Sequence, residues 1–200
     1  MSDAALNPGH GPFRYDPLTI TLHWLTFLLV ALLWLSAQVI DVFPRDGGRV
    51  EARSVHILLG VTLLGVLLVR LGWRKTPWGG RRPPRRGPGD LAALGLQVLM
   101  LLLLGGTILL GLFNAAVHGA AVFTWVKLPP LAPGYPDLPD MVTGWHGFGA
   151  NLILAVVGVH AAAALGHHYV LRDCTLRRML PFGRVTCGKH DHRAAPAQGD

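Results

Sequence analysis

The sequence MVTGWHGFGANLILAVVGVHAAAALGHHYVLRD, residues 141–173, decides the fold and points to the chemistry. It is long and apolar enough to cross a bilayer as a helix, yet it carries histidines at positions 146, 160, 167 and 168. Imidazoles within a membrane span are costly and usually functional. His146 and His160 are 14 residues apart, so they share one helix face at depths that differ by about 21 Å. This arrangement predicts two stacked cofactor sites, one near each membrane surface.

Three further stretches are long and apolar enough to cross a hydrocarbon core about 30 Å thick. Charged residues make up only 14% of the 200-residue chain, and the connections are short, so no soluble domain is expected. The sequence therefore predicts an all-α integral membrane protein with a four-helix bundle. Its spans are residues 18–40, 54–73, 90–114 and 141–170. Its parts are an N-terminal tail (1–17), the transmembrane domain (18–173) and a basic tail (174–200).

Positive charge is concentrated in two of the segments outside the spans. Arginine and lysine cluster over residues 74–86 and again in the C-terminal tail, whereas the other connections hold acidic residues beside their basic ones. The positive-inside rule then places both termini in the cytoplasm. The net charge of +7 thus reflects topology, and we expect no nucleic-acid partner. Cys174 and Cys187 would lie on the same cytoplasmic side, where a structural disulfide is not expected.

Two earlier spans supply one histidine each. His23 enters five residues into the first span, near the cytoplasmic surface, and His56 opens the second span, near the external surface. Matching depths pairs His23 with His160 and His56 with His146. No carboxylate or thiol lies at either depth, so a b-type haem with two axial imidazoles is favoured over zinc or copper. Space for the macrocycle would come from Gly60, Gly65, Gly147, Gly149 and Gly158. The alternative is that the histidines are only helix-packing hydrogen-bonders, which their match in depth and facing disfavours.

Arg70 follows His56 by 14 residues on the same face, at the depth of the inner site. Its guanidinium would pair with an anionic group of the cofactor, such as a haem propionate. The alternative is an arginine that extends its charged end to the membrane surface. A six-coordinate haem has no open position for a substrate, so outer-sphere electron transfer between the two membrane surfaces is the chemistry expected.

The chain resembles the bacterial cytochrome b561 family and, within it, the superoxide oxidase branch. The resemblance covers about residues 13–182 and is carried by VGVHAAAALGHHYVLRD (157–173), TLRRMLP (175–181), LHWL (22–25), FPR (43–45), WH (145–146) and ANL (150–152). It implies two haem b groups in a bacterial inner membrane, with His23 and His160 as ligands of the inner iron and His56 and His146 as ligands of the outer iron. One departure is that the third span has Ala93 and Leu96 where relatives are associated with histidine. The four-ligand scheme does not use that position.

The same resemblance implies that superoxide is oxidised to O2 at the outer surface and that ubiquinone is reduced inside the membrane. Four basic residues are candidates to attract the superoxide anion to the outer haem: Arg45, Arg49, Arg53 and Lys127. His167, about two turns beyond His160, is a candidate to hydrogen-bond a quinone carbonyl and supply a proton, with an ordinary interfacial histidine as the alternative. The other function left open is a b-type electron-transfer subunit that links the quinone pool to a partner redox protein.

Overall fold

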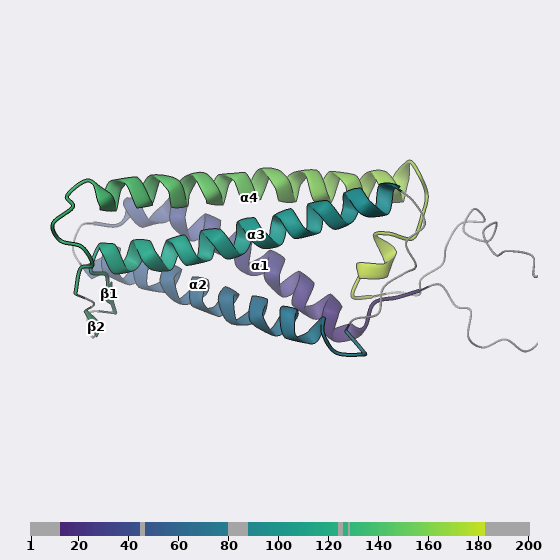
Figure 1. Cartoon of the computed structure of the whole chain (residues 1–200), viewed down its shortest axis with the longest axis horizontal. Helices are drawn as coiled ribbons and strands as arrows, with labels where there is room; N and C mark the ends of the chain where they lie inside the picture. Colours follow the sequence, from purple (N-terminus) through teal and green to yellow (C-terminus); the bar gives the residue numbers. More distant parts are fainter. Residues whose placement is uncertain (1–12, 45–46, 80–87, 124–125, 128, 183–200) are drawn as a thin grey trace, which may run out of the picture.

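The structure, a computed structural model, describes residues 13–44, 47–79, 88–123, 126–127 and 129–182. Four long helices run along the molecule (Figure 1). They are α1 (Pro17–Val39), α2 (Gly47–Trp73), α3 (Pro88–Val117) and α4 (Leu138–Tyr169). Each is long and apolar enough to cross a membrane, so the prediction of a four-span helical bundle is confirmed for the described residues.

The start of α1 is fixed by local capping chemistry. Asp16 is the N-cap, and its carboxylate accepts hydrogen bonds from the Thr19 backbone N–H at 2.9 Å and from the Thr19 hydroxyl at 2.5 Å. Pro17 occupies the first turn, where its missing N–H costs nothing. The same carboxylate accepts from the Trp73 indole at 3.0 Å, which joins the start of α1 to the end of α2. Burial raises the pKa of Asp16, but these hydrogen bonds outweigh it and hold the pKa below the usual 3.8.

Helix α2 begins at Gly47, seven residues before the predicted span, so the turn between α1 and α2 is shorter than expected. A short 3-10 helix, η1 (Ile40–Val42), ends the first span. Arg49 on the first turns of α2 donates to the Phe43 carbonyl at 3.1 Å and forms a 3.3 Å ion pair with Asp41. These contacts hold the polar first turns in helical form beyond the apolar part of the sequence. Helix α3 likewise ends about three residues after its predicted span, and α4 begins about three residues before its predicted span.

The connection from α3 to α4 contains a small hairpin that the sequence did not predict. Strands β1 (Ala121–Val122) and β2 (Val126–Lys127) pair antiparallel, with Val122 opposite Val126. Ser54 on α2 is fully buried against this hairpin and accepts a hydrogen bond from the Phe123 N–H at 2.8 Å. The Ser54 hydroxyl also lies 2.7 Å from the Val50 carbonyl on its own helix. The hairpin is thereby fastened to the start of α2.

Helix packing leaves only a thin core. The closest helix pairs are α3 with α4 and α1 with α2, while α2 also packs on α3. Leu29, Leu63, Leu67 and Ile108 form the buried centre, of which Leu63 is 1% exposed. Large apolar side chains elsewhere on all four helices point outward. An apolar exterior around a small core is the pattern that a lipid environment favours.

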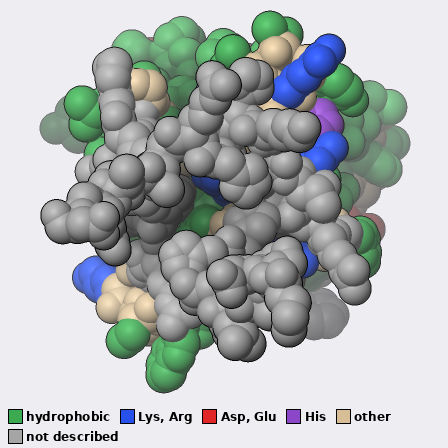
Figure 2. All heavy atoms as spheres, turned by 90° about the vertical axis from the view of Figure 1, so that its right-hand side faces the viewer, with side chains coloured by type: hydrophobic (Ala, Val, Ile, Leu, Met, Phe, Trp, Pro, Cys, Tyr) green, Lys and Arg blue, Asp and Glu red, His purple; other side chains and the backbone are tan. Residues whose placement is uncertain are grey.

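The two described ends of the chain meet at one end of the bundle, which we call the terminal end; the opposite end is the hairpin end (Figure 1). After α4 the chain folds back through a 3-10 helix, η2 (Arg177–Met179). Arg14 donates to the carbonyls of Leu180 and Pro181, both at 3.1 Å, and the Trp24 indole donates to the Met179 carbonyl at 2.8 Å. Lysine and arginine side chains appear on this end, with hydrophobic side chains around its rim (Figure 2).

Cys174 lies in this returning segment and is 1% exposed. It is disulfide-bonded, so the expectation that the chain has no structural disulfide is wrong for this residue. The other cysteine of the chain, Cys187, lies outside the described residues. Sequence reasoning took the compartment as the deciding factor, whereas the fold buries Cys174 in the turn that covers the terminal end.

Candidate functional site

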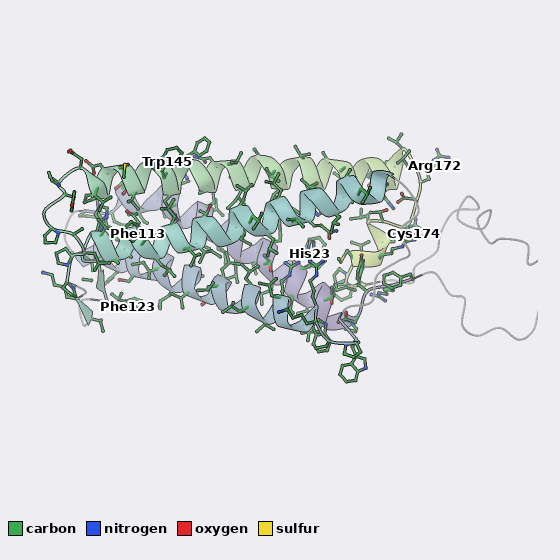
Figure 3. The ribbon with its side chains drawn as sticks, in the orientation of Figure 1. His23, Phe113, Phe123, Trp145, Arg172 and Cys174 are labelled. Atoms are coloured by element: carbon green, nitrogen blue, oxygen red, sulfur yellow. The ribbon has the colours of Figure 1, made fainter. Side chains whose placement is uncertain are left out.

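Two pairs of histidine rings face each other between the helices. In the first, His23 of α1 and His160 of α4 have ring centroids 6.3 Å apart, with 65° between the ring planes. In the second, His56 of α2 and His146 of α4 have centroids 6.2 Å apart and planes at 86°. Figure 3 shows His23 toward the end that also holds Arg172 and Cys174, with Trp145, next to His146, at the opposite end. We call them the terminal-end pair and the hairpin-end pair; these are the two pairs that matching depths predicted.

The spacing within each pair fits one metal ion between two imidazoles. Two metal–nitrogen bonds of about 2 Å, plus about 1.2 Å from each ring nitrogen to its ring centre, separate the centroids by about 6.4 Å. The observed 6.3 and 6.2 Å agree with this value. Among the described residues no group of three or more His, Cys, Asp or Glu side chains is placed to hold a metal ion. Each pair therefore offers two axial ligands, which suits a metal whose remaining ligands come from a planar macrocycle.

The hairpin-end pair is oriented by hydrogen bonds on the far side of each ring. Ser36 donates its hydroxyl hydrogen to the Leu33 carbonyl at 2.8 Å, so His56 donates its Nδ1–H to the Ser36 oxygen, also at 2.8 Å. His146 donates its Nδ1–H to the Thr107 carbonyl at 3.1 Å. Both contacts assign the hydrogen to Nδ1 and leave the lone pair on Nε2, the tautomer that a metal ligand needs.

Gly111 of α3 makes room for the ring of His146. A Cβ added at Gly111 would lie 2.7 Å from Cε1 of His146 and 3.1 Å from its Nδ1. A Cβ added at Gly149 would lie 2.6 Å from the Thr107 hydroxyl, so this glycine also permits the close contact of α4 with α3. Gly60 has no atom within 4 Å of its Cβ position, and it lies one turn from His56 on the same face.

Arg70 stands beside the terminal-end pair. Its guanidinium donates to the Thr26 hydroxyl across the α1–α2 contact at 2.9 Å, and Thr26 in turn donates to the Leu22 carbonyl at 2.6 Å. Thr26 is buried and lies one turn after His23, which is within electrostatic reach of Arg70. Arg70 is partly buried and is held in place by this contact between α1 and α2. Sequence analysis missed Thr26, although a hydroxyl one turn from a histidine on the same face was a usable signal.

His167 lies at the end of α4, beyond the terminal-end pair. Its Nδ1 is 2.6 Å from the Asp173 carboxylate, and the Asp173 N–H donates to the His167 carbonyl at 3.1 Å. Burial raises the pKa of Asp173, but hydrogen bonds from His167 and Thr175 outweigh it and hold the pKa below the usual 3.8. The carboxylate therefore fixes the His167 ring with Nε2 as its other polar atom.

The basic residues predicted to attract superoxide are not equivalent. Arg49 forms an ion pair with Asp41, whereas Arg53 and Lys127 are exposed at the hairpin end. Arg45 lies outside the described residues. Because the Asp41 carboxylate cancels much of the field of Arg49, this arginine attracts an anion less than it would alone.

A bundle of four membrane-length helices that presents imidazole pairs at two depths has the architecture of a membrane b-type cytochrome. The profile of the prokaryotic cytochrome b561 family matches residues 14–182, and the chain belongs to this family. Members of this family carry b-type haem and transfer electrons within membranes. The chain is a multi-pass membrane cytochrome of this kind.

Three curated relatives support the assignment. A protein of Yersinia pestis named probable superoxide oxidase CybB is 32% identical over 178 residues, which are 86% of this chain and 98% of the relative. Cytochrome b562 of Cereibacter sphaeroides is 31% identical over 83% of this chain and 94% of its own. Cytochrome b561 homolog 2 of Escherichia coli is 27% identical over 84% of this chain and 92% of its own. The first of these names points to an oxidoreductase activity.

Proposed function

We propose that this chain is a di-haem b cytochrome that transfers electrons from superoxide at the hairpin end to ubiquinone at the terminal end. The observation that carries the proposal is the pair of imidazole spacings, 6.3 and 6.2 Å, at two depths of one bundle. His23 and His160 would hold one haem iron, and His56 and His146 the other. When bound, b-type haem with both axial positions filled supplies one-electron transfer without a bond between iron and substrate.

The terminal end would face the cytoplasm of a bacterial inner membrane. Six described basic residues support this orientation by their place before α1, after α2 or after α4, which is at or next to that end: Arg14, Arg74, Lys75, Arg172, Arg177 and Arg178. The hairpin end holds acidic residues beside its basic ones, as the positive-inside rule expects of an external face. Superoxide would then be collected outside the cell membrane and electrons delivered toward the inside.

Arg70 would stabilise an anionic edge of the terminal-end haem. Its guanidinium has five N–H donors, and the described contact to Thr26 uses one terminal nitrogen, NH1, of the group. Thr26 fixes the position of the guanidinium, because its own hydroxyl is anchored on the Leu22 carbonyl. A charge held in this way would pair with a propionate without first being ordered by it.

Superoxide would be drawn to the hairpin end by Arg53 and Lys127 and would need no shaped pocket, since it is a small anion. Two superoxide anions each release one electron and leave as O2. One ubiquinone takes up these two electrons with two protons and becomes the quinol. His167 would hydrogen-bond a quinone carbonyl through Nε2 and supply a proton to it, and the Asp173 carboxylate, 2.6 Å from Nδ1, would hold the ring in position.

A superoxide pulse on purified, oxidised, haem-loaded protein tests this proposal. Haem absorption is followed with and without added ubiquinone, in wild type and in His167→Ala. We expect rapid haem reduction in both proteins, then reoxidation by quinone that is slowed in the variant. A b-type spectrum that does not respond to superoxide would overturn the oxidase activity and favour an electron-transfer subunit that acts with a partner protein.

A further inference from the structure

We propose that the surroundings of the two histidine pairs give the hairpin-end site a lower reduction potential than the terminal-end site. This inference rests on the proposed function, because it requires one haem at each pair. It adds a property that the paired histidines alone do not define, which is the thermodynamically favourable direction of electron transfer between the two sites. Two residues outside the ligand set, Ser36 and Arg70, would determine this order.

At the hairpin-end pair, both imidazoles donate their second N–H to an oxygen. His56 donates to the Ser36 hydroxyl at 2.8 Å, and His146 donates to the Thr107 carbonyl at 3.1 Å. Such hydrogen bonds give the imidazole more anionic character and make Nε2 a stronger donor to iron. A stronger donor stabilises the ferric state more than the ferrous state. The two contacts therefore lower the potential of this site.

The terminal-end pair differs from the hairpin-end pair in the hydrogen bonding of its imidazoles and in the charge beside it. Among the hydrogen bonds of the described residues, none uses a ring nitrogen of His23 or His160, so these imidazoles are the weaker donors. The guanidinium of Arg70 is also fixed nearby by Thr26 at 2.9 Å. A cation in a medium of low dielectric favours the form of the site that carries one more electron. Both differences raise the potential of this site relative to the other.

The order that follows makes electron transfer from the hairpin end to the terminal end favourable and the return unfavourable. Ser36 is then a positioning residue that acts through His56. Arg70 acts through its fixed charge, and Thr26 acts by holding Arg70. None of these residues needs to touch a substrate to bias the direction of flow.

Potentiometry of the purified, haem-loaded protein, followed by optical absorption, tests the inference. We expect two waves in wild type. Ser36→Ala removes the acceptor of the His56 N–H and should shift the lower wave upward, whereas Ser36→Thr, which keeps the hydroxyl, should leave it in place. Arg70→Gln should shift the upper wave downward. A matched control is Thr62→Ala, which removes a hydroxyl of α2 whose one hydrogen bond among the described residues is to the Leu58 carbonyl of its own helix, and it should move neither wave.

Variants that lack one site assign the waves: His160→Ala should keep only the lower one. The inference is overturned if Ser36→Ala shifts the upper wave or neither wave, or if Arg70→Gln leaves the upper wave in place. Those results leave a protein with two haems, so the proposed function would stand. Two haems per chain that titrate in a single wave would overturn this inference alone, whereas fewer than two haems per chain would overturn the proposed function and this inference together.

Discussion

Substituting Gly111 by alanine should release one haem and retain the other. The added Cβ would lie 2.7 Å from Cε1 of His146, whereas carbon atoms in ordinary contact are about 3.5–4.0 Å apart. The ring would have to move by about 1 Å, against a tolerance of about 0.2 Å in a metal–ligand distance. Such a movement breaks coordination at the hairpin-end pair and does not reach the terminal-end pair, which lies about 21 Å away along α4.

The assay is the ratio of haem to protein in purified samples, together with the optical spectrum. Gly111→Ala should lower the ratio from about two to about one. Gly106→Ala is the matched control, since it lies on the same helix with nothing within 4 Å of its Cβ position. Alanine favours helix over glycine by about 1 kcal/mol at both positions, so weakening of α3 cannot explain a loss. Two haems and an unchanged spectrum in Gly111→Ala would refute the reasoning.

Three further predictions concern the ends of the bundle. Asp16→Ala should lower the free energy of unfolding in detergent by about 1 kcal/mol, because it removes the N-cap of α1, while Asp137→Ala, at an N-cap without a side-chain hydrogen bond, should have a smaller effect. The combined change of Arg53 and Lys127 to glutamine should lower the rate of the reaction with superoxide and weaken the dependence of that rate on salt. Arg49→Gln should lower the rate less, because Arg49 is paired with Asp41. Stopped-flow rates that rank these variants in the opposite order would contradict the attraction of superoxide by Arg53 and Lys127. Because the pKa of Asp173 is lowered in the folded protein, its stabilising contribution is present above its unfolded pKa near 3.8 and is lost as pH falls through the folded value. The melting temperature of wild type should therefore fall more steeply below pH about 4 than that of Asp173→Asn, and parallel curves would contradict this sign.

The features of this fold that follow a simple period could be predicted from the sequence. Spans of about 20 apolar residues define the helices, and a rise of 1.5 Å per residue converts positions 146 and 160 into two depths. The same arithmetic brings His23 to the depth of His160 and Arg70 to the depth of both. These steps need only helix geometry and the thickness of a bilayer.

Contacts that depend on how helices rotate against each other could not be predicted in the same way. Ser36, Thr26 and the Thr107 carbonyl reach their partners across helix contacts, and no period in the sequence marks them. Gly149 shows the same limit, since its close contact with Thr107 of α3 was not predicted. The hairpin of β1 and β2, with two residues per strand, is too short for any alternation to be recognised.

The segment after α4 depends on long-range contacts as well. Arg14 and Trp24 bind carbonyls near positions 179–181, more than 150 residues later in the chain. Cys174 is buried by this return of the chain, so its disulfide could not be judged from the expected compartment alone. Composition suggested only a basic tail in this region.

The most direct test of two haems, each held by one histidine pair, is the haem content and spin state of the purified full-length protein after haem-replete expression. Two b-type haems per chain, both low-spin because each iron has two axial imidazoles, is the result expected from the 6.3 and 6.2 Å spacings. A single haem per chain, or a high-spin signal from an open axial position, would contradict it.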